Sequence, residues 1–174
     1  MDSFFDRLKV TALAGLALGA TLGAASAAEL MAPTGDVILT IEGAISVTNE
    51  GDTAVFDLAA LEALPSTTYE TETPWTTGVT SFEGVELSTL LELVGAEGSE
   101  IDAVAINDYS TILPLTDEIG ASPLVAYKVD GAYVSVREKG PLWLVYPFDS
   151  DSRLQSEVYY SRSIWQLRTL NIRP

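Results

Sequence analysis

The stretch that decides the fold is residues 124–136, which read LVAYKVDGAYVSV. Two runs rich in aliphatic and aromatic residues, 124–129 and 132–136, flank the dipeptide Asp130-Gly131. A two-residue turn of the mirror-image type needs positive φ at its central positions, which Asp and Gly tolerate. The stretch therefore predicts an antiparallel β-hairpin.

Further strands are expected on both sides of this hairpin, because short apolar runs alternate with turn residues. The expected strands are residues 37–47, 66–73, 101–106, 142–146 and 164–172, with one more short strand closed by Pro114. Residues 75–82 are expected to form a loop through Gly78. Strands thus predominate along the chain.

Two short helices are expected between these strands. Asp57 offers an N-cap to a helix over residues 58–64, which Pro65 ends. Ser88 is expected to cap a second helix, which gives way to Gly95 at its C-terminal end. Short helices among many strands predict an α+β fold.

The composition excludes several kinds of site. The sequence has 174 residues and contains neither cysteine nor histidine. It therefore offers no thiolate or imidazole ligand for zinc, copper or haem iron, and no histidine as a general base. We expect no metal site and no catalytic residue.

The first residues have the pattern of an export signal. Arg7 and Lys9 precede an apolar run over residues 10–22, and small residues follow at Ala25 and Ala27. This pattern predicts a signal peptide over residues 1–27, cleavage before Ala28 and a periplasmic protein with one domain over residues 28–174. An uncleaved membrane anchor is the alternative.

Charge is distributed unevenly along the chain. The formal net charge is −16, which disfavours nucleic acid as a partner. From residue 28 to 127 there are 18 acids and no bases, whereas residues 128–174 hold seven bases and five acids. Any cationic site for an anionic ligand or partner is therefore expected in the last third.

Four different segments, taken in their order along the chain, form a pattern. They are residues 82–87 followed by Leu90 and Leu91, residues 107–109 with Pro114, residues 124–131, and residues 140–147. Together they resemble the molybdopterin-binding domain of the sulfite oxidase family, over most of residues 57–174. The resemblance implies that family's strand-rich α+β fold. It is greatest to short periplasmic members, which include pterin-binding receptors that regulate membrane-bound cyclic-di-GMP enzymes.

Two departures from the family pattern bear on the cofactor. The family's redox members bind molybdenum through a cysteine, and the matching position here is at or near Thr71. A threonine hydroxyl is a poor substitute for a soft thiolate. Trp143 stands where those members carry an arginine for the cofactor's phosphate, with Glu138 near a position usually held by asparagine. A free pterin fits these changes better than molybdopterin, unless Arg137, Lys139 or Arg153 holds a phosphate instead.

A pterin is a flat bicycle with a guanidine-like edge, so its receptor needs an aromatic platform and hydrogen-bond acceptors. Asp108 or Glu138 would supply carboxylate oxygens, and Asn107 would meet the carbonyl edge. The stacking candidates are Tyr109, Trp143, Trp75 and Trp165, for which core packing is the alternative role. For Asp108 the alternative is a turn residue. The cluster Arg137, Glu138, Lys139 and Gly140 is either a binding loop or a salt-bridged surface turn.

These observations lead to one main hypothesis and three alternatives. The main hypothesis is a periplasmic pterin receptor without redox chemistry, which the resemblance implies acts on a membrane-bound cyclic-di-GMP signalling enzyme. One alternative is a molybdopterin-dependent oxidoreductase or its subunit. The others are a hydrolase using serine with Lys128 or Lys139, and a scaffold that binds only protein.

Overall fold

The computed structural model describes residues 30–174, so the predicted signal peptide over residues 1–27 lies outside the described residues. The first sheet has the strand order β2 (Ala54–Phe56), β1 (Leu39–Gly43), β10 (Leu167–Arg173), β5 (Glu100–Ala105) and β6 (Ser110–Pro114). The second has the order β3 (Thr67–Glu72), β4 (Val79–Glu86), β7 (Leu124–Val129) and β8 (Ala132–Tyr133), and β9 (Trp143–Val145) also pairs with β7.

The helices are all short. The α-helices are α1 (Leu58–Glu62), α2 (Leu87–Leu93) and α3 (Glu157–Arg162), and the 3-10 turns are η1 (Val136–Glu138), η2 (Phe148–Ser150) and η3 (Ser152–Leu154). The fold is therefore α+β and rich in strand, as the sequence predicts. No helix within residues 30–174 combines the length and apolar character needed to cross a bilayer.

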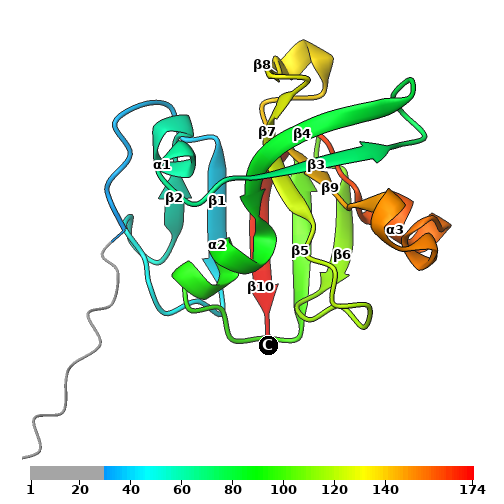
Figure 1. Ribbon diagram of the computed structural model, residues 1–174. Helices are drawn as coiled ribbons and strands as arrows, with labels where there is room; N and C mark the ends of the chain where they lie inside the picture. Colours follow the sequence, from blue (N-terminus) through cyan, green and yellow to red (C-terminus); the bar gives the residue numbers. More distant parts are fainter. Residues whose placement is uncertain (1–29) are drawn as a thin grey trace, which may run out of the picture.

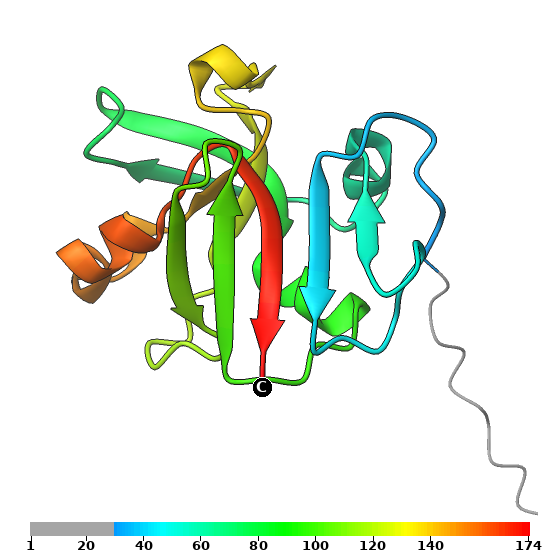
Figure 2. The same cartoon turned by 180° about the vertical axis from the view of Figure 1, so that it is seen from behind.

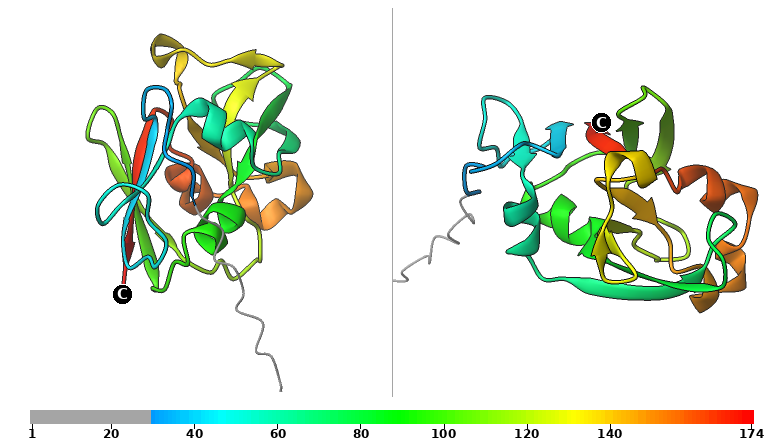
Figure 3. Two further views of the ribbon diagram at one scale, coloured as in Figure 1. Left: turned by 90° about the vertical axis from the view of Figure 1, so that its left-hand side faces the viewer. Right: turned by 90° about the horizontal axis from the view of Figure 1, so that it is seen from above.

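The two sheets and the helices form layers (Figure 3). The first sheet stands as one layer, and its outer face has no helix over it (Figure 2). Strand β5 alternates buried and less buried residues, as expected when one face of a sheet packs inward. The buried core lies between the layers and includes Ile41, Phe82, Leu90, Leu144 and Leu170. β1 and β10 pair in parallel, and the other pairs are antiparallel.

The predicted hairpin is confirmed, although its second strand is shorter than expected. Asp130 and Gly131 have φ of 48° and 76°, the positive values that the turn requires. β8 ends at Tyr133 rather than Val136, because Ser135 accepts hydrogen bonds from the backbone N–H groups of Glu138 and Gly140, at 2.9 and 2.8 Å. The chain turns there into η1 instead of continuing the ladder.

Other expected boundaries were wrong. The expected loop 75–82 is a strand from Val79 onward. The prediction missed this strand because the polar Thr80 lies on its buried face, so the sequence does not alternate between apolar and polar residues there. Ser88 caps no helix: α2 starts at Leu87 directly after β4, and the Leu87 N–H donates to the Pro123 carbonyl at 2.8 Å. The first and last strands of the chain are also shorter than expected at their starts or ends. β1 covers residues 39–43 of the expected 37–47, and β10 starts at Leu167 rather than at residue 164.

Asp57 is the N-cap of α1, as predicted. One carboxylate oxygen accepts the Ala60 N–H at 2.7 Å, and the other accepts the Thr34 and Gly35 N–H groups, also at 2.7 Å. These hydrogen bonds, above all those from Ala60 and Gly35, stabilise the ionised form and lower the pKa of Asp57 from its ordinary 3.8.

The Asp57→Asn variant is expected to change the acid sensitivity of the fold. Because the folded-state pKa is lowered, the Asp57 charge contributes stability above pH 3.8, and this is lost as the pH falls through the folded value. The wild type should therefore be more stable than Asp57→Asn at neutral pH, with a gap that narrows in acid. Urea unfolding of both proteins from neutral to acid pH measures this difference in stability. A difference that does not depend on pH would contradict the prediction.

Candidate functional site

All three tryptophans of the chain lie together. Trp75 comes from the turn between β3 and β4, Trp143 from β9, and Trp165 from the segment that leads into β10. The ring centroid of Trp75 is 6.1 Å from that of Trp143 and 5.8 Å from that of Trp165. The β3–β4 hairpin extends past the other strands of the second sheet (Figure 1), and Trp75 packs against Tyr160 of α3.

A cleft of about 470 Å³ opens beside this cluster, within the range typical of ligand pockets. Four segments contribute to its lining: the hairpin tip, the β5–β6 turn, α3 and the residues before β10. The lining residues are Pro74, Trp75, Ala105, Asn107, Tyr109, Glu157, Tyr160, Ser161, Ser163, Ile164 and Trp165. Aromatic rings and a few polar groups thus converge on one hollow.

The aromatic rings of the cleft meet edge to face. Trp75 and Trp165 are inclined at 73°, and Trp75 and Tyr160 at 84° with centroids 6.0 Å apart. Such a pair forms a corner rather than a parallel sandwich. A flat ligand in the cleft would therefore stack on one ring and meet the edge of the next.

Helix α3 is held in place by Asp117. Its two carboxylate oxygens accept the Tyr159 hydroxyl, each at 3.0 Å, and one also accepts Arg162 Nη1 at 3.4 Å. Burial, and then the hydrogen bond to Asp117, raise the pKa of Tyr159. The phenol therefore remains a donor at neutral pH. Tyr159 faces the core from α3, which leaves Tyr160 and Glu157 to line the cleft.

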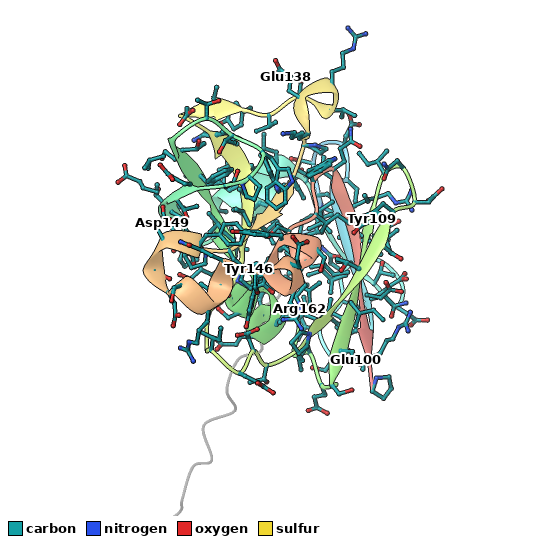
Figure 4. The ribbon with its side chains drawn as sticks, turned by 90° about the vertical axis from the view of Figure 1, so that its right-hand side faces the viewer. Glu100, Tyr109, Glu138, Tyr146, Asp149 and Arg162 are labelled. Carbon is teal, nitrogen blue, oxygen red and sulfur yellow. The ribbon has the colours of Figure 1, made fainter. Side chains whose placement is uncertain are left out.

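The predicted site residues do not all come together. Trp75, Asn107 and Tyr109 line the cleft, whereas Arg137, Glu138, Lys139 and Trp143 line a separate hollow of about 430 Å³. Figure 4 shows Glu138 at one end of the molecule and Tyr109 beside the first sheet, well apart.

Asp108 lines neither hollow that contains predicted residues. Its φ of 63° marks it as a turn residue, and its exposed carboxylate pairs with Arg168 at 3.4 Å. Gly140 is buried against the Val134 carbonyl, and it donates its backbone N–H to the Ser135 carbonyl. These two positions shape turns in the structure.

Lys139 connects the two hollows. Its Nζ lies 5.0 Å from the ring centroid of Trp143 and 5.5 Å from that of Trp165, and it donates to the carbonyl of Trp75 at 3.3 Å. Contacts of this kind between an ammonium and an indole face are attractive. Trp143 itself is only 3% exposed, and its indole N–H has no hydrogen-bond partner within residues 30–174.

Thr71 lies away from the cleft lining and is fully buried. Its Oγ1 accepts the Asp149 N–H at 3.1 Å and donates to the Glu72 carbonyl at 3.4 Å. This hydroxyl ties β3 to η2. Both of its hydrogen-bonding functions are thus used within the protein.

The lining contains residues that the sequence did not single out. Glu157 and Tyr160 belong to α3, which was not predicted at all, while Trp165 was predicted as a stacking candidate. The available signal was Ser156 before Glu157, a pairing common at a helix start.

No protein-family model matches the chain, and no curated protein sequence matches it.

Proposed function

We propose that this chain is a receptor for a pterin, bound in the cleft between Trp75, Trp165 and Tyr160, and that its two sheets form the sulfite oxidase-type molybdopterin-binding fold. The observation that supports a pterin as the ligand is the cleft, where indole and phenol rings converge on a hollow of about 470 Å³. The proposal of the family fold rests on the four sequence segments that resemble the family in the same order.

The polar groups of the cleft match the two edges of a pterin. Glu157 is the carboxylate of the lining, and paired carboxylate oxygens suit the adjacent N–H groups of a guanidine-like edge. Asn107 offers both a donor and an acceptor to the carbonyl edge. Glu157 takes the part that the sequence had suggested for Asp108 or Glu138.

The residues present do not fit a molybdenum centre. The position matched to the metal-binding cysteine is near Thr71, whose hydroxyl is buried and bonded to Asp149 and Glu72. At the position matched to the phosphate-binding arginine, Trp143 is buried beneath Lys139. We therefore assign no redox step to this chain.

The proposal extends to location and signalling. On the resemblance, the receptor works in the periplasm and passes its ligand state to the periplasmic part of a membrane-bound cyclic-di-GMP enzyme. This part is supported by the export pattern of residues 1–27 and by the family segments. The cleft supports the ligand only.

The Glu157→Gln variant tests the ligand's orientation. Titration calorimetry with pterin and 7,8-dihydropterin should show saturable binding to the wild type, accompanied by a change in tryptophan fluorescence, because the indoles of Trp75 and Trp165 line the cleft. Loss of the charge on one hydrogen-bonding partner typically costs about 1.5–3 kcal/mol, so affinity should fall about tenfold or more.

Glu92→Gln is the matched control, since Glu92 is an exposed glutamate of α2 outside the cleft lining. It should bind like the wild type, and both variants should unfold at similar temperatures. Absence of saturable pterin binding by the wild type would remove the proposed function. Stoichiometric molybdenum in the purified protein would favour the oxidoreductase instead.

A further inference from the structure

The loop after β8 carries the cluster Arg137, Glu138 and Lys139, which the cleft does not use. We call residues 132–139 the crest; it projects at one end of the second sheet (Figures 1 and 4). Within residues 30–174, β8 pairs only with β7, through Tyr133 and Ala132. The outer edge of β8 is therefore open to another strand.

The crest also contains both of the bases that form no ion pair within residues 30–174. Residues 30–174 hold seven bases, the nine of the whole sequence less Arg7 and Lys9. Five of them form ion pairs with carboxylates: Lys128, Arg153, Arg162, Arg168 and Arg173. The remaining two are Arg137 and Lys139. Since Lys139 is held against the indoles, Arg137 is the exposed cation of the described chain that is left for an outside carboxylate.

Apolar groups stand beside Arg137. Tyr133 is 56% exposed and Val136 is 50% exposed. Tyr133 lines the hollow of about 430 Å³, together with Val129 and Trp143. The local carboxylate, Glu138, accepts a hydrogen bond from the Ser135 hydroxyl at 3.1 Å. The crest thus combines a free cation, apolar side chains and an open strand edge.

We propose that the crest is a docking surface for an acidic, apolar segment of a partner protein, which pairs with the edge of β8 and places a carboxylate against Arg137. Local charge complementarity selects this occupant, because Arg137 is exposed and forms no ion pair within residues 30–174. A small anion would use Arg137 but would leave the exposed Val136 and the strand edge without a role.

The crest is linked to the cleft by hydrogen bonds. Lys139 donates to the carbonyl of Trp75, and Gln166, next to Trp165, donates its backbone N–H to the Lys139 carbonyl at 3.0 Å. The Gln166 side chain also donates to the Val136 carbonyl at 2.7 Å. A ligand that shifts either indole thereby acts on the crest, and docking acts equally on ligand affinity. This coupling, unlike the docking, rests on the proposed function.

Peptides of defined charge test the docking. The probes are a capped decapeptide of alternating glutamate and valine and its lysine–valine counterpart, titrated into the purified protein while backbone amide resonances are followed. The glutamate peptide should shift resonances of the crest and of β7, and the lysine peptide should not. Arg137→Glu should weaken binding about tenfold. The matched control is Arg153→Glu, an exposed arginine already paired with Asp151 elsewhere, which should leave binding unchanged.

Each of the other results would overturn the docking surface. Equal binding of both peptides, or unchanged affinity in Arg137→Glu, overturns the docking surface. Sodium phosphate that displaces the peptide and causes the same shifts identifies a small-anion site and overturns it too. Resonance shifts confined to residues outside the crest and β7 would also overturn the docking surface.

A parallel pterin titration separates this proposal from the proposed function. If pterin binds and the glutamate peptide does not, the docking surface is wrong and the receptor stands. If the peptide binds the crest of a protein that binds no pterin, the docking surface stands alone. With both present, saturating pterin should change the peptide Kd about fivefold or more, and Lys139→Met should reduce that effect. An unchanged Kd overturns the coupling.

Discussion

Replacing Gly140 with alanine is expected to lower the free energy of unfolding by about 2–3 kcal/mol, the upper part of the usual range for overpacking. A Cβ at Gly140 would overlap the carbonyl oxygen of Val134 and lie 2.9 Å from that of Ser135. Both obstacles are backbone atoms, so no side-chain rotation relieves them. The Gly140 N–H also closes the turn by donating to Ser135 at 2.8 Å.

The clash has a second expected effect, on the tryptophans. Moving the backbone at Gly140 displaces Lys139, whose ammonium contacts Trp143 and Trp165. Urea unfolding followed by tryptophan fluorescence measures both the stability and the folded-state emission. Gly35→Ala is the control, since its new Cβ would meet only the side chain of Asp57, with Oδ2 at an ordinary 3.5 Å and Cβ at 3.9 Å. Equal stability of the two variants would contradict the close approach at Gly140.

The Trp75→Ala variant is expected to lose most of its affinity for pterin. Stacking of a flat heterocycle on an aromatic side chain contributes about 1–3 kcal/mol, which corresponds to a loss of about fivefold to hundredfold. Trp75 also contacts four other rings, at centroid distances of 5.8 to 6.3 Å. Its removal therefore opens the corner on which the ligand would stack. Calorimetric titration with 7,8-dihydropterin measures the loss.

Trp75→Phe is the matched variant for this result. It keeps a ring at the hairpin tip and should retain more affinity than Trp75→Ala. Thermal unfolding of both variants shows whether the fold is intact, which is expected because Trp75 is only partly buried. Wild-type affinity in Trp75→Ala would place the ligand outside this cleft, and the hollow beneath the crest would be the next site to examine.

Local rules predicted the parts of the fold that depend on a few adjacent residues. The Asp130-Gly131 turn and the Asp57 cap are confirmed, because each is determined by φ angles or hydrogen bonds within a few positions. The extent of β4 was missed, since its buried face includes Thr80 and Gly84 and does not look apolar. Gly84 has a packing reason to be there: a Cβ would overlap the backbone of Val125 in β7.

The cleft was harder to predict than the fold. Trp75 and Trp165 are ninety positions apart, and no local pattern indicates that a hairpin tip reaches the start of β10. Helix α3 has too few residues to show a helical period, so Glu157 and Tyr160 gave no sign of facing one side. Conversely, Arg137 and Trp75 were grouped by the family resemblance, whereas the structure places them on different hollows.

The place of β10 in the first sheet has a consequence for how the protein acquires its shape. β10 follows every other strand along the chain, yet it lies in the middle of its sheet, between β1 and β5. While the ribosome is still releasing the preceding residues, β1 and β5 have no central partner, so this sheet cannot assemble vectorially. Such long-range pairing slows folding. The first sheet should therefore form only when β10 is available, after every other strand has been synthesised.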